Sequence, residues 1–348
     1  MSLPARARPH QAAAKSPTTN AERAERIKAI LADSEAHNTR EAKRNDLAGL
    51  AAWQEAQGLT PGLPLAPDEF LAWLDWLAHE AIDPRKGGKV GFSTSTVERK
   101  AHTVSATHKR LGYESPISDP TVAAWLLALP KRKAPEKHAR PLRIEDLCNV
   151  LRVLAVEERN QAYKARDRAL LLVGFSAALR RSEIIGLDVA DVEPAPKGAI
   201  VRVRRSKTDQ AGEGVAIPIY RRTIYCPVGA VRDWLKLRAE QSEGAIPSDA
   251  PLFVGVNRGG GVKASRMCAR NVDVIVKARC EAAGLVGYSA HSLRAGYCVS
   301  SREAGSTEFS IRRTTRHKSV ASLHRYFSGA GIFDEDPFAQ FDQEQANR

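Results

Sequence analysis

A proline-rich basic segment divides the chain into two parts. Residues 130–141 read PKRKAPEKHARP and combine three prolines with six lysine, arginine or histidine side chains. Proline interrupts regular secondary structure, and the segments on either side both carry helical periodicity. A chain of 348 residues is also long enough for two domains. We therefore predict an interdomain linker at 130–141, a first domain over 20–129 and a second domain over 142–348.

The first domain is predicted to be helical and to follow a flexible basic tail. Residues 1–19 are rich in alanine, proline and arginine and show no periodicity. From Asn20 onwards, apolar side chains recur at the spacing of amphipathic helices. One of these helices should begin at Ser95, because Ser95 and Glu98 have the spacing of a capping box. Its apolar face should include Leu111.

The second domain is predicted to be mainly helical with a small antiparallel β-sheet. Ala169–Leu179 is apolar on every side, as a buried helix is. At 199–219 the period changes, because the β-branched runs AIVRVRR and GVAIPI flank the polar stretch SKTDQAGE. This pattern is typical of a β-hairpin. Further helices are expected at about 228–241, 267–283, 290–304 and 319–327.

The chain carries an excess of positive charge. Lys and Arg total 53 against 40 Asp and Glu, a formal net charge of +13. Such an excess favours a polyanionic partner, most often a nucleic acid, although some soluble proteins are merely basic. The apolar run 169–179 is too short to span a membrane, and the amino terminus lacks the apolar core of a secretory signal, so we expect a cytoplasmic protein. The five cysteines include no C-x-x-C pair and predict neither a zinc site nor disulfides.

Three short motifs of the second domain combine residue types suited to an anion. Arg180 and Glu183 are three residues apart and can pair on one helical face, which in isolation is most often a surface ion pair. Lys207 lies at the predicted hairpin, where it could reach a groove or remain solvated. His291 and Arg294 begin a predicted helix, whose dipole favours an anion at this end. A capping histidine is the alternative.

A fourth motif, RHKSVASLHRYF, places His317 nine residues before Tyr326. Val320, Leu323 and Phe327 have the spacing of the buried face of a short helix, and Tyr326 lies beside that face. A tyrosine in this position is held by packing and turns its hydroxyl outward, as a nucleophile requires. A half-buried core tyrosine and a surface histidine are the alternative, which this stretch alone leaves open.

In this order and spacing, the four motifs resemble those of the tyrosine recombinase (phage integrase) family, which includes Cre. SAALRRSEIIGL is similar to the family's first arginine box, SAHSLRAG to its second box and RHKSVASLHRYF to its nucleophile box. Several motifs in a fixed order are far more specific than any one of them. The resemblance covers the second domain, and HNTREAKRNDLAGLAAWQEAQGL is more weakly similar to the helical, SAM-like core-binding domain. It implies a site-specific recombinase of the integrase or resolvase type, acting through a Holliday junction.

The resemblance also implies a role for each motif residue. Tyr326 would attack a DNA phosphorus, form a covalent 3′-phosphotyrosyl bond and release a 5′-hydroxyl. The other implied roles are phosphate binding by Arg180 and Arg294, protonation of the leaving oxygen by Lys207, proton transfer at the tyrosine by His291, a hydrogen bond to the phosphate from His317, and orientation of Arg180 and the nearby histidine by Glu183. Neither a metal, ATP nor any other cofactor is implied.

One position departs from the family's pattern. Where the family commonly has glycine before the histidine of the last box, this chain has Arg316. The side chain adds a positive charge near the site and changes the loop that aims His317. His324 is a second imidazole only two residues before Tyr326, but the family's spacing favours His317.

The resemblance implies that the partner is double-stranded DNA with an inverted-repeat recombination site. The protein would bind two such sites as a homotetramer, in the cytoplasm of a bacterium and associated with the nucleoid. The 95–111 helix is the candidate for the major groove, although a charged helix face is usually only solvated. Residues 328–348, with three phenylalanines among acidic side chains, should dock on a neighbouring subunit or be disordered. The basic candidates for DNA contact are Arg40, Lys43, Arg44, Arg99, Lys100, His102, Lys131, Arg132 and Lys133.

Three other functions fit parts of the pattern. A DNA-binding protein without catalysis is disfavoured by the complete set of motif residues. A type IB topoisomerase shares the chemistry and would relax supercoils without strand exchange. A metal-dependent nuclease is poorly supported, because the sequence has no H-E-x-x-H motif and no acidic cluster within the predicted site.

Overall fold

The chain forms two compact units, Met1–Lys137 and His138–Arg348. The computed structural model describes residues 37–84, 87–132, 140–204, 214–317, 319–324 and 326–327. The boundary between the units falls within 130–141, where the sequence predicts a linker. Each unit has a hydrophobic core of its own and is described separately.

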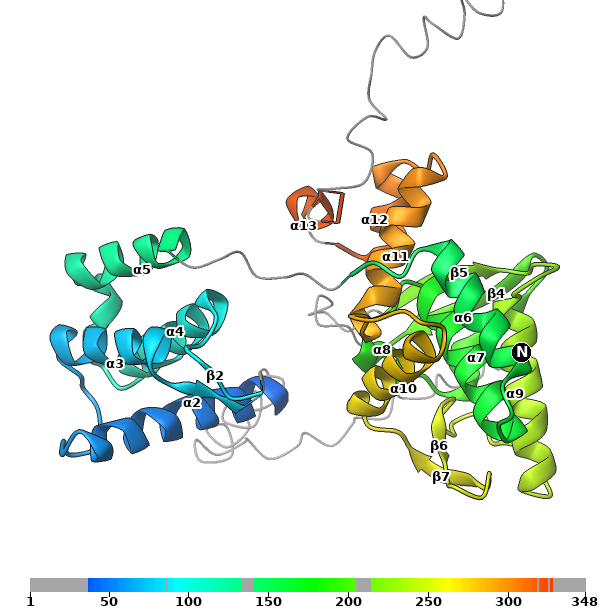
Figure 1. Cartoon of the computed structure of the whole chain (residues 1–348), viewed down its shortest axis with the longest axis horizontal. Helices are drawn as coiled ribbons and strands as arrows, with labels where there is room; N and C mark the ends of the chain where they lie inside the picture. The colour runs from blue at the N-terminus through cyan, green and yellow to red at the C-terminus, as the bar shows by residue number, and fades with distance from the viewer. Residues whose placement is uncertain are drawn as a thin grey trace, which may run out of the picture. The chain divides into compact units, whose positions relative to one another are not determined.

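The first unit is a small helical domain (Figure 1). Phe70, Trp73, Leu74, Val97 and Val104 are buried in its core, so the amphipathic periodicity of the sequence faces inward. A two-stranded antiparallel ribbon pairs Ile82 with Val90. Its elements are α2 (His37–Ala56), α3 (Pro67–His79), β1 (Ile82–Asp83), β2 (Lys89–Val90), α4 (Thr94–Arg110), the 3₁₀ helix η2 (Pro116–Ser118) and α5 (Pro120–Arg132).

Helix α4 differs from its prediction at both ends. Its N-cap residue is Ser93, two residues before the expected start, so Ser95 lies inside the first turn. The Ser93 carbonyl accepts from the Val97 N–H at 3.0 Å, so the first helical turn closes before the position that the capping-box spacing predicts. Leu111 is the C-cap residue that follows the helix and is 53 % exposed rather than buried.

The second unit is mainly helical with small antiparallel sheets, so the predicted fold class is confirmed. Helix α7 is buried over most of its length, as the apolar run 169–179 predicts. Its elements are α6 (Ile144–Val156), α7 (Gln161–Ser176), α8 (Arg181–Gly186), the 3₁₀ helix η3 (Val189–Asp191), β3 (Val192–Ala195), β4 (Gly198–Val203), β5 (Val215–Tyr220), α9 (Pro227–Gln241), β6 (Val254–Val256), β7 (Val262–Arg266), α10 (Ala269–Ala282), α11 (Ala290–Glu303), α12 (Glu308–Thr315) and α13 (Val320–His324).

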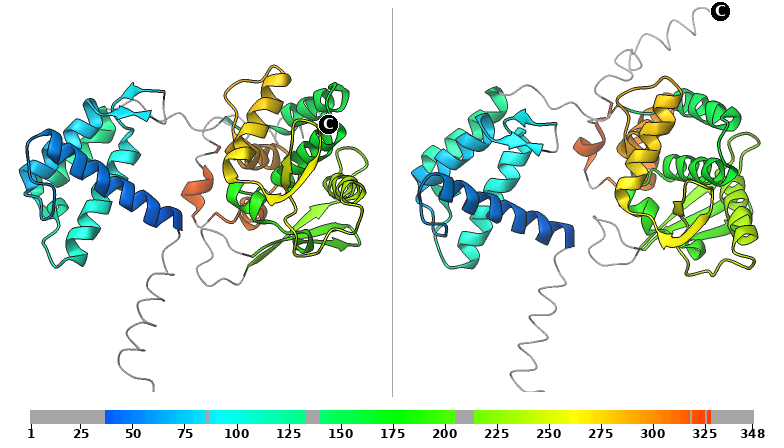
Figure 2. Two further views of the ribbon diagram at one scale, coloured as in Figure 1. Left: turned by 90° about the horizontal axis from the view of Figure 1, so that it is seen from below. Right: turned by 60° about the horizontal axis from the view of Figure 1, so that its bottom comes forward.

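The predicted hairpin forms the larger part of a three-stranded sheet. Strands β4 and β5 pair from Gly198 with Tyr220 to Val203 with Val215, and β3 adds to the other edge of β4. Alternate side chains such as Val201 and Ile217 are buried, and β5 packs against α7 and α9. Figures 1 and 2 show α10 alongside α8 and α11 in the same unit. No separate range was predicted for five short elements, β3, α8, α12, β6 and β7.

Within the described part of the chain, no helix is long and apolar enough to cross a membrane. The five cysteines are free thiols. Among the described residues, no group of three or more His, Cys, Asp and Glu side chains is arranged to hold a metal ion.

Candidate active site

The motif residues come together from four separate segments of the second unit. Arg180 directly precedes α8, which carries Glu183. His291 and Arg294 lie in the first turns of α11. His317 follows α12, and Tyr326 follows α13. Lys207 lies outside the described residues.

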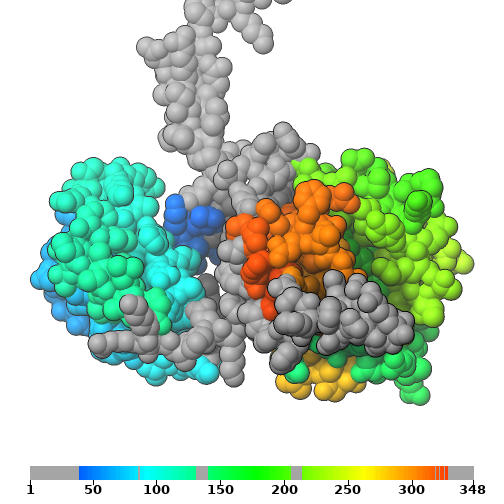
Figure 3. Space-filling view, turned by 90° about the horizontal axis from the view of Figure 1, so that it is seen from above, coloured from blue at the N-terminus to red at the C-terminus, as the bar shows by residue number. Residues whose placement is uncertain are grey.

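The Tyr326 hydroxyl lies 2.8 Å from Nε2 of His291. The ring of His317 is also close, with its centroid 5.4 Å from that of Tyr326. The Tyr326 ring packs with Phe327 on a small cluster of Cys298, Ile311 and Leu323, so the tyrosine is half-buried with its hydroxyl among imidazoles. Helices α12 and α13, which carry Ile311 and Leu323 of this cluster, lie next to each other at the surface (Figure 3).

Arg294 is buried at the centre of the site, with 1 % of its surface exposed. Its Nη1 donates to the Ala178 carbonyl at 2.7 Å, and its Nη2 donates to the Thr315 carbonyl. Burial lowers the pKa of the Arg294 guanidinium to about 10, and the neighbouring charges of Arg180 and Arg316 add to this effect. The guanidinium remains charged at neutral pH. Two carbonyls fix its plane, so it is held in place before any ligand arrives.

Glu183 organises two arginines. Its Oε1 accepts from Nη1 of Arg180 at 2.7 Å, and its Oε2 accepts from the Arg180 backbone N–H at 2.8 Å. Oε2 also accepts from Nη2 of Arg316 at 2.8 Å. We expected Glu183 to orient Arg180 and a histidine; the second partner that the structure records is Arg316. The carboxylate is 2 % exposed, which makes this ion pair much less screened than a surface pair.

His317 is held as a neutral ring. Burial, and then the charges of Arg294 and Arg180, lower the pKa of its imidazole to about 3. Its Nδ1 lies 2.8 Å from Oγ1 of Thr315, whose hydroxyl donates to the Ile311 carbonyl. Oγ1 therefore accepts from His317, which assigns the ring proton to Nδ1 and leaves Nε2 as an acceptor.

Replacing His317 by glutamine should change the pH dependence of stability. The histidine titrates near 6.5 when unfolded and near 3 when folded, so between these values the unfolded chain binds more protons. Wild-type stability should therefore fall relative to H317Q as pH is lowered, by about 2 kcal/mol from pH 7 to pH 5. Urea denaturation of both proteins at the two pH values measures this. A constant difference between them would show that His317 titrates normally in the folded state.

The start of α11 is fixed by contacts that the sequence did not reveal. The Ala290 N–H donates to Oδ1 of Asp273 at 2.9 Å, and Arg181 donates to Oδ2 of the same carboxylate at 2.5 Å. Further along α11, a Cβ added to Gly296 would lie 1.7 Å from the Leu142 carbonyl oxygen. The backbone after the linker segment thus crosses α11 at van der Waals distance from a glycine. These contacts fix the start of α11, and with it His291 and Arg294, against the neighbouring segments.

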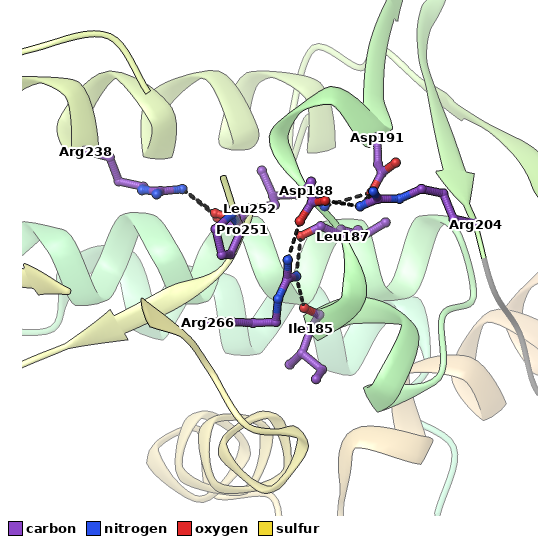
Figure 4. A network of polar contacts seen from close by, with 9 residues as sticks. All are labelled: Ile185, Leu187, Asp188, Asp191, Arg204, Arg238, Pro251, Leu252 and Arg266. Carbon is purple, nitrogen blue, oxygen red and sulfur yellow. Dashed lines mark hydrogen bonds and ion pairs between the residues drawn. The ribbon is translucent and has the colours of Figure 1, made fainter. Parts of the chain in front are cut away.

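A polar network lies at the carboxyl end of β4 (Figure 4). Arg204, the last described residue before 205–213, donates to Asp188 and, at 2.7 Å, to Asp191. Arg266 also donates to Asp188 and, at 2.6 Å, to the Ile185 carbonyl at the end of α8. Burial would raise the pKa of the Asp188 carboxyl, but hydrogen bonds from Arg204 and Arg266 outweigh it and hold the pKa below its usual range. The network joins the end of β4 to the helix that carries Glu183.

In the first unit, the basic candidates on α4 have different environments. Lys100 is 12 % exposed and donates at 3.1 Å to the buried carboxylate of Asp46 on α2, to which Arg99 also donates. Lys100 therefore holds α2 against α4. Arg99 keeps 43 % of its side chain exposed. The exposed face of α4, at helical spacing, consists of Ser95, Arg99, His102, Ala106 and Lys109.

The remaining DNA-contact candidates lie on other elements of the first unit. Arg40 and Arg44 are exposed on α2, and Lys43 is half-buried there. Lys131 and Arg132 end α5. Lys133 and residues 328–348 lie outside the described residues.

The family model described as the phage integrase family matches residues 144–330. An integrase/recombinase xerD homolog of Selenomonas ruminantium is 29 % identical over 318 residues, which cover 89 % of this chain and 87 % of the relative. A tyrosine recombinase XerC of Rhodospirillum centenum is 29 % identical over 290 residues, which cover 81 % and 75 % of the two chains.

Solved structures share the fold at lower sequence identity. The Tn1549 transposon integrase in complex with transposon right end DNA has a TM-score of 0.61 and 16 % identity, covering 92 % of this chain and 98 % of that one. A lambda integrase dimer bound to a core site has a TM-score of 0.54 and 17 % identity, covering 89 % and 95 %.

Proposed function

Since the chain belongs to the phage integrase family of tyrosine recombinases, we propose that it is a site-specific DNA recombinase whose nucleophile is Tyr326. One observation carries the choice of nucleophile. The Tyr326 hydroxyl lies 2.8 Å from a histidine nitrogen and beside a buried cluster of arginines in the same protomer. A tyrosine that served only packing would have no need of these neighbours.

The cleavage step assigns one task to each group. The Tyr326 oxygen attacks a backbone phosphorus and passes its proton to Nε2 of His291. A bond forms between the tyrosine oxygen and phosphorus, and the bond to the 5′-oxygen breaks. Lys207 gives the departing oxygen a proton, which produces a 5′-hydroxyl. Attack by another 5′-hydroxyl on the phosphotyrosine reverses the sequence and rejoins the strand without an external energy source.

The arginines stabilise the charge that grows at phosphorus. Guanidinium groups bind nonbridging phosphate oxygens in a planar, two-pronged geometry, which suits Arg180 and Arg294. Both are held by protein oxygens before DNA arrives, so little reorganisation opposes the reaction. Nε2 of the neutral His317 ring can donate to a phosphate oxygen once the ring adopts its other tautomer, in which the Thr315 hydroxyl donates to Nδ1.

Covalent capture tests the proposed function. Wild-type protein is incubated with a library of nicked duplexes, which lose the 5′-hydroxyl fragment and trap the intermediate, and the attached DNA is sequenced. We expect a defined site on the wild type and on the control Tyr297→Phe, and no adduct on Tyr326→Phe. Tyr297 on α11 is the matched control because its ring packs against Phe175 of α7. Equal capture by all three proteins, or none by the wild type, would contradict the proposal.

The captured site also separates the rival enzymes. Strand exchange between two copies of the site indicates a recombinase, whereas relaxation of supercoils without exchange indicates a type IB topoisomerase. Capture that persists in EDTA argues against a metal-dependent nuclease.

Recombination requires assembly on DNA, for which we propose a homotetramer on two sites linked through residues 328–348. Exposed apolar side chains, Phe309 on α12 and Val320 on α13, lie on the elements that precede this segment and offer a surface for it. Deleting 330–348 should leave binding of one protomer to a half-site unchanged and slow recombination by about tenfold or more, because avidity between subunits is lost. Gel-shift and recombination assays measure the two effects. Unchanged recombination would exclude this role of the tail.

A further inference from the structure

Arg316 occupies an unusual backbone position for its type. It ends α12 with φ 58° and ψ 40°, a left-handed conformation that favours glycine and costs other residues roughly 1 kcal/mol. Its side chain is nevertheless 7 % exposed and extends into the site. A strained backbone that presents a buried cation requires an explanation in the contacts of that cation.

Those contacts satisfy only some of the hydrogen-bond donors of the Arg316 guanidinium. Nη2 of Arg316 donates to Oε2 of Glu183 at 2.8 Å and, weakly, to the Ala178 carbonyl at 3.4 Å. Nε and Nη1 are buried and have no hydrogen-bond partner among the described residues. Burial lowers the pKa of the Arg316 guanidinium, and the charge of Arg180 lowers it further. A buried donor without a partner is destabilising, so this arrangement lowers the stability of the DNA-free protein.

The charges of the cluster are unbalanced in the DNA-free state. Among the described residues of the cluster, three guanidinium groups, those of Arg180, Arg294 and Arg316, face one carboxylate, which is that of Glu183. His317 is neutral and does not change this balance. Two positive charges are therefore left over. A phosphodiester carries one negative charge, and five-coordinate phosphorus in the transition state approaches two. The cluster matches the transition state better than the bound substrate.

We propose that Arg316 is a positioning residue that fixes Arg180 through Glu183 and supplies the additional buried charge that balances the second negative charge at phosphorus. This inference rests on the proposed function. Because Nε and Nη1 are inaccessible to solvent, Arg316 acts through its field and through Glu183 rather than by touching DNA. The surplus positive charge of the arginine cluster is balanced only when the phosphate group gains its second negative charge in the transition state.

The test compares two substrates that differ in charge. The DNA site captured on the wild type is made either with its normal scissile phosphodiester or with a methylphosphonate, in which a neutral methyl group replaces one nonbridging oxygen. We expect Arg316→Met to slow cleavage of the phosphodiester by about 10- to 100-fold, less than loss of a directly bonded donor. On the methylphosphonate, whose transition state carries one negative charge less, its deficit should be under about threefold. Arg316→Lys, which keeps the charge, should recover most of the phosphodiester rate.

Arg316→Gly keeps the test decisive if methionine disturbs folding. Glycine adopts the left-handed conformation without strain, so this variant should fold, and it should show the same dependence on substrate charge. An equal deficit on both substrates would reduce Arg316 to a structural support and overturn the proposal, as would full phosphodiester activity in R316M and R316G. Failure of the wild type to cleave the phosphodiester would instead contradict the proposed function itself.

Discussion

Replacing Arg294 by lysine is expected to slow DNA cleavage by about 10²- to 10³-fold. The guanidinium donates to the carbonyls of Ala178 and Thr315 with two different nitrogens, and it is buried. A lysine ammonium is a point charge without this fork, so it cannot hold both carbonyls and also face a phosphate. One buried carbonyl would lose its partner, which should lower the free energy of unfolding by on the order of 1–3 kcal/mol.

Single-turnover cleavage of the captured site and urea denaturation measure the two effects of R294K. Arg232→Lys is the control, because the Arg232 side chain on α9 is 80 % exposed. The control should match the wild type in both assays. A cleavage rate for R294K within about threefold of the wild type would show that only the charge at this position matters, and that its planar geometry does not.

Replacing Gly296 by alanine should give the largest loss of stability. The added Cβ would lie 1.7 Å from the Leu142 carbonyl oxygen and 2.4 Å from its carbonyl carbon. The obstacle is backbone, and the Leu142 N–H donates to the Ser292 carbonyl of α11 at 2.9 Å, so relief requires the two segments to separate. We expect the free energy of unfolding to fall by at least about 3 kcal/mol.

Gly186→Ala is the matched control for G296A. A Cβ at Gly186 would meet nothing within 4 Å, and its φ is not in the left-handed region, so this variant should be as stable as the wild type. Urea denaturation compares the two variants. G296A should also lose cleavage activity, since Arg294 moves with α11. Wild-type stability in G296A would mean that residues near Leu142 do not cross the helix as described.

The sequence was informative where a pattern is long or repeated. The apolar run 169–179 predicts the buried helix α7, and the β-branched runs at 199–219 predict the β4–β5 hairpin. Helix α8 has six residues and β6 has three, too few for periodicity to distinguish them from loops. They form because neighbouring elements hold them, as Arg266 holds the end of α8.

The candidate site likewise has a part that the sequence predicted and a part that it did not. Its charged and nucleophilic side chains stand in motifs and could be named from the sequence, and Arg316 was visible as a departure from the family's glycine. Some of the groups that hold them are backbone atoms, such as the carbonyl of Ala178, which any residue type provides. The role of Gly296 likewise depends on which segment crosses α11. Such contacts are set by tertiary structure and leave no pattern along the chain.

Mass spectrometry of the trapped protein–DNA adduct tests the central claim most directly. After nuclease and protease digestion, we expect one modified peptide, with a nucleotide joined through its 3′-phosphate to Tyr326. The Tyr297→Phe variant should give the same peptide, and Tyr326→Phe should give none. A nucleotide on any other residue, or an adduct that persists in Tyr326→Phe, would contradict the account.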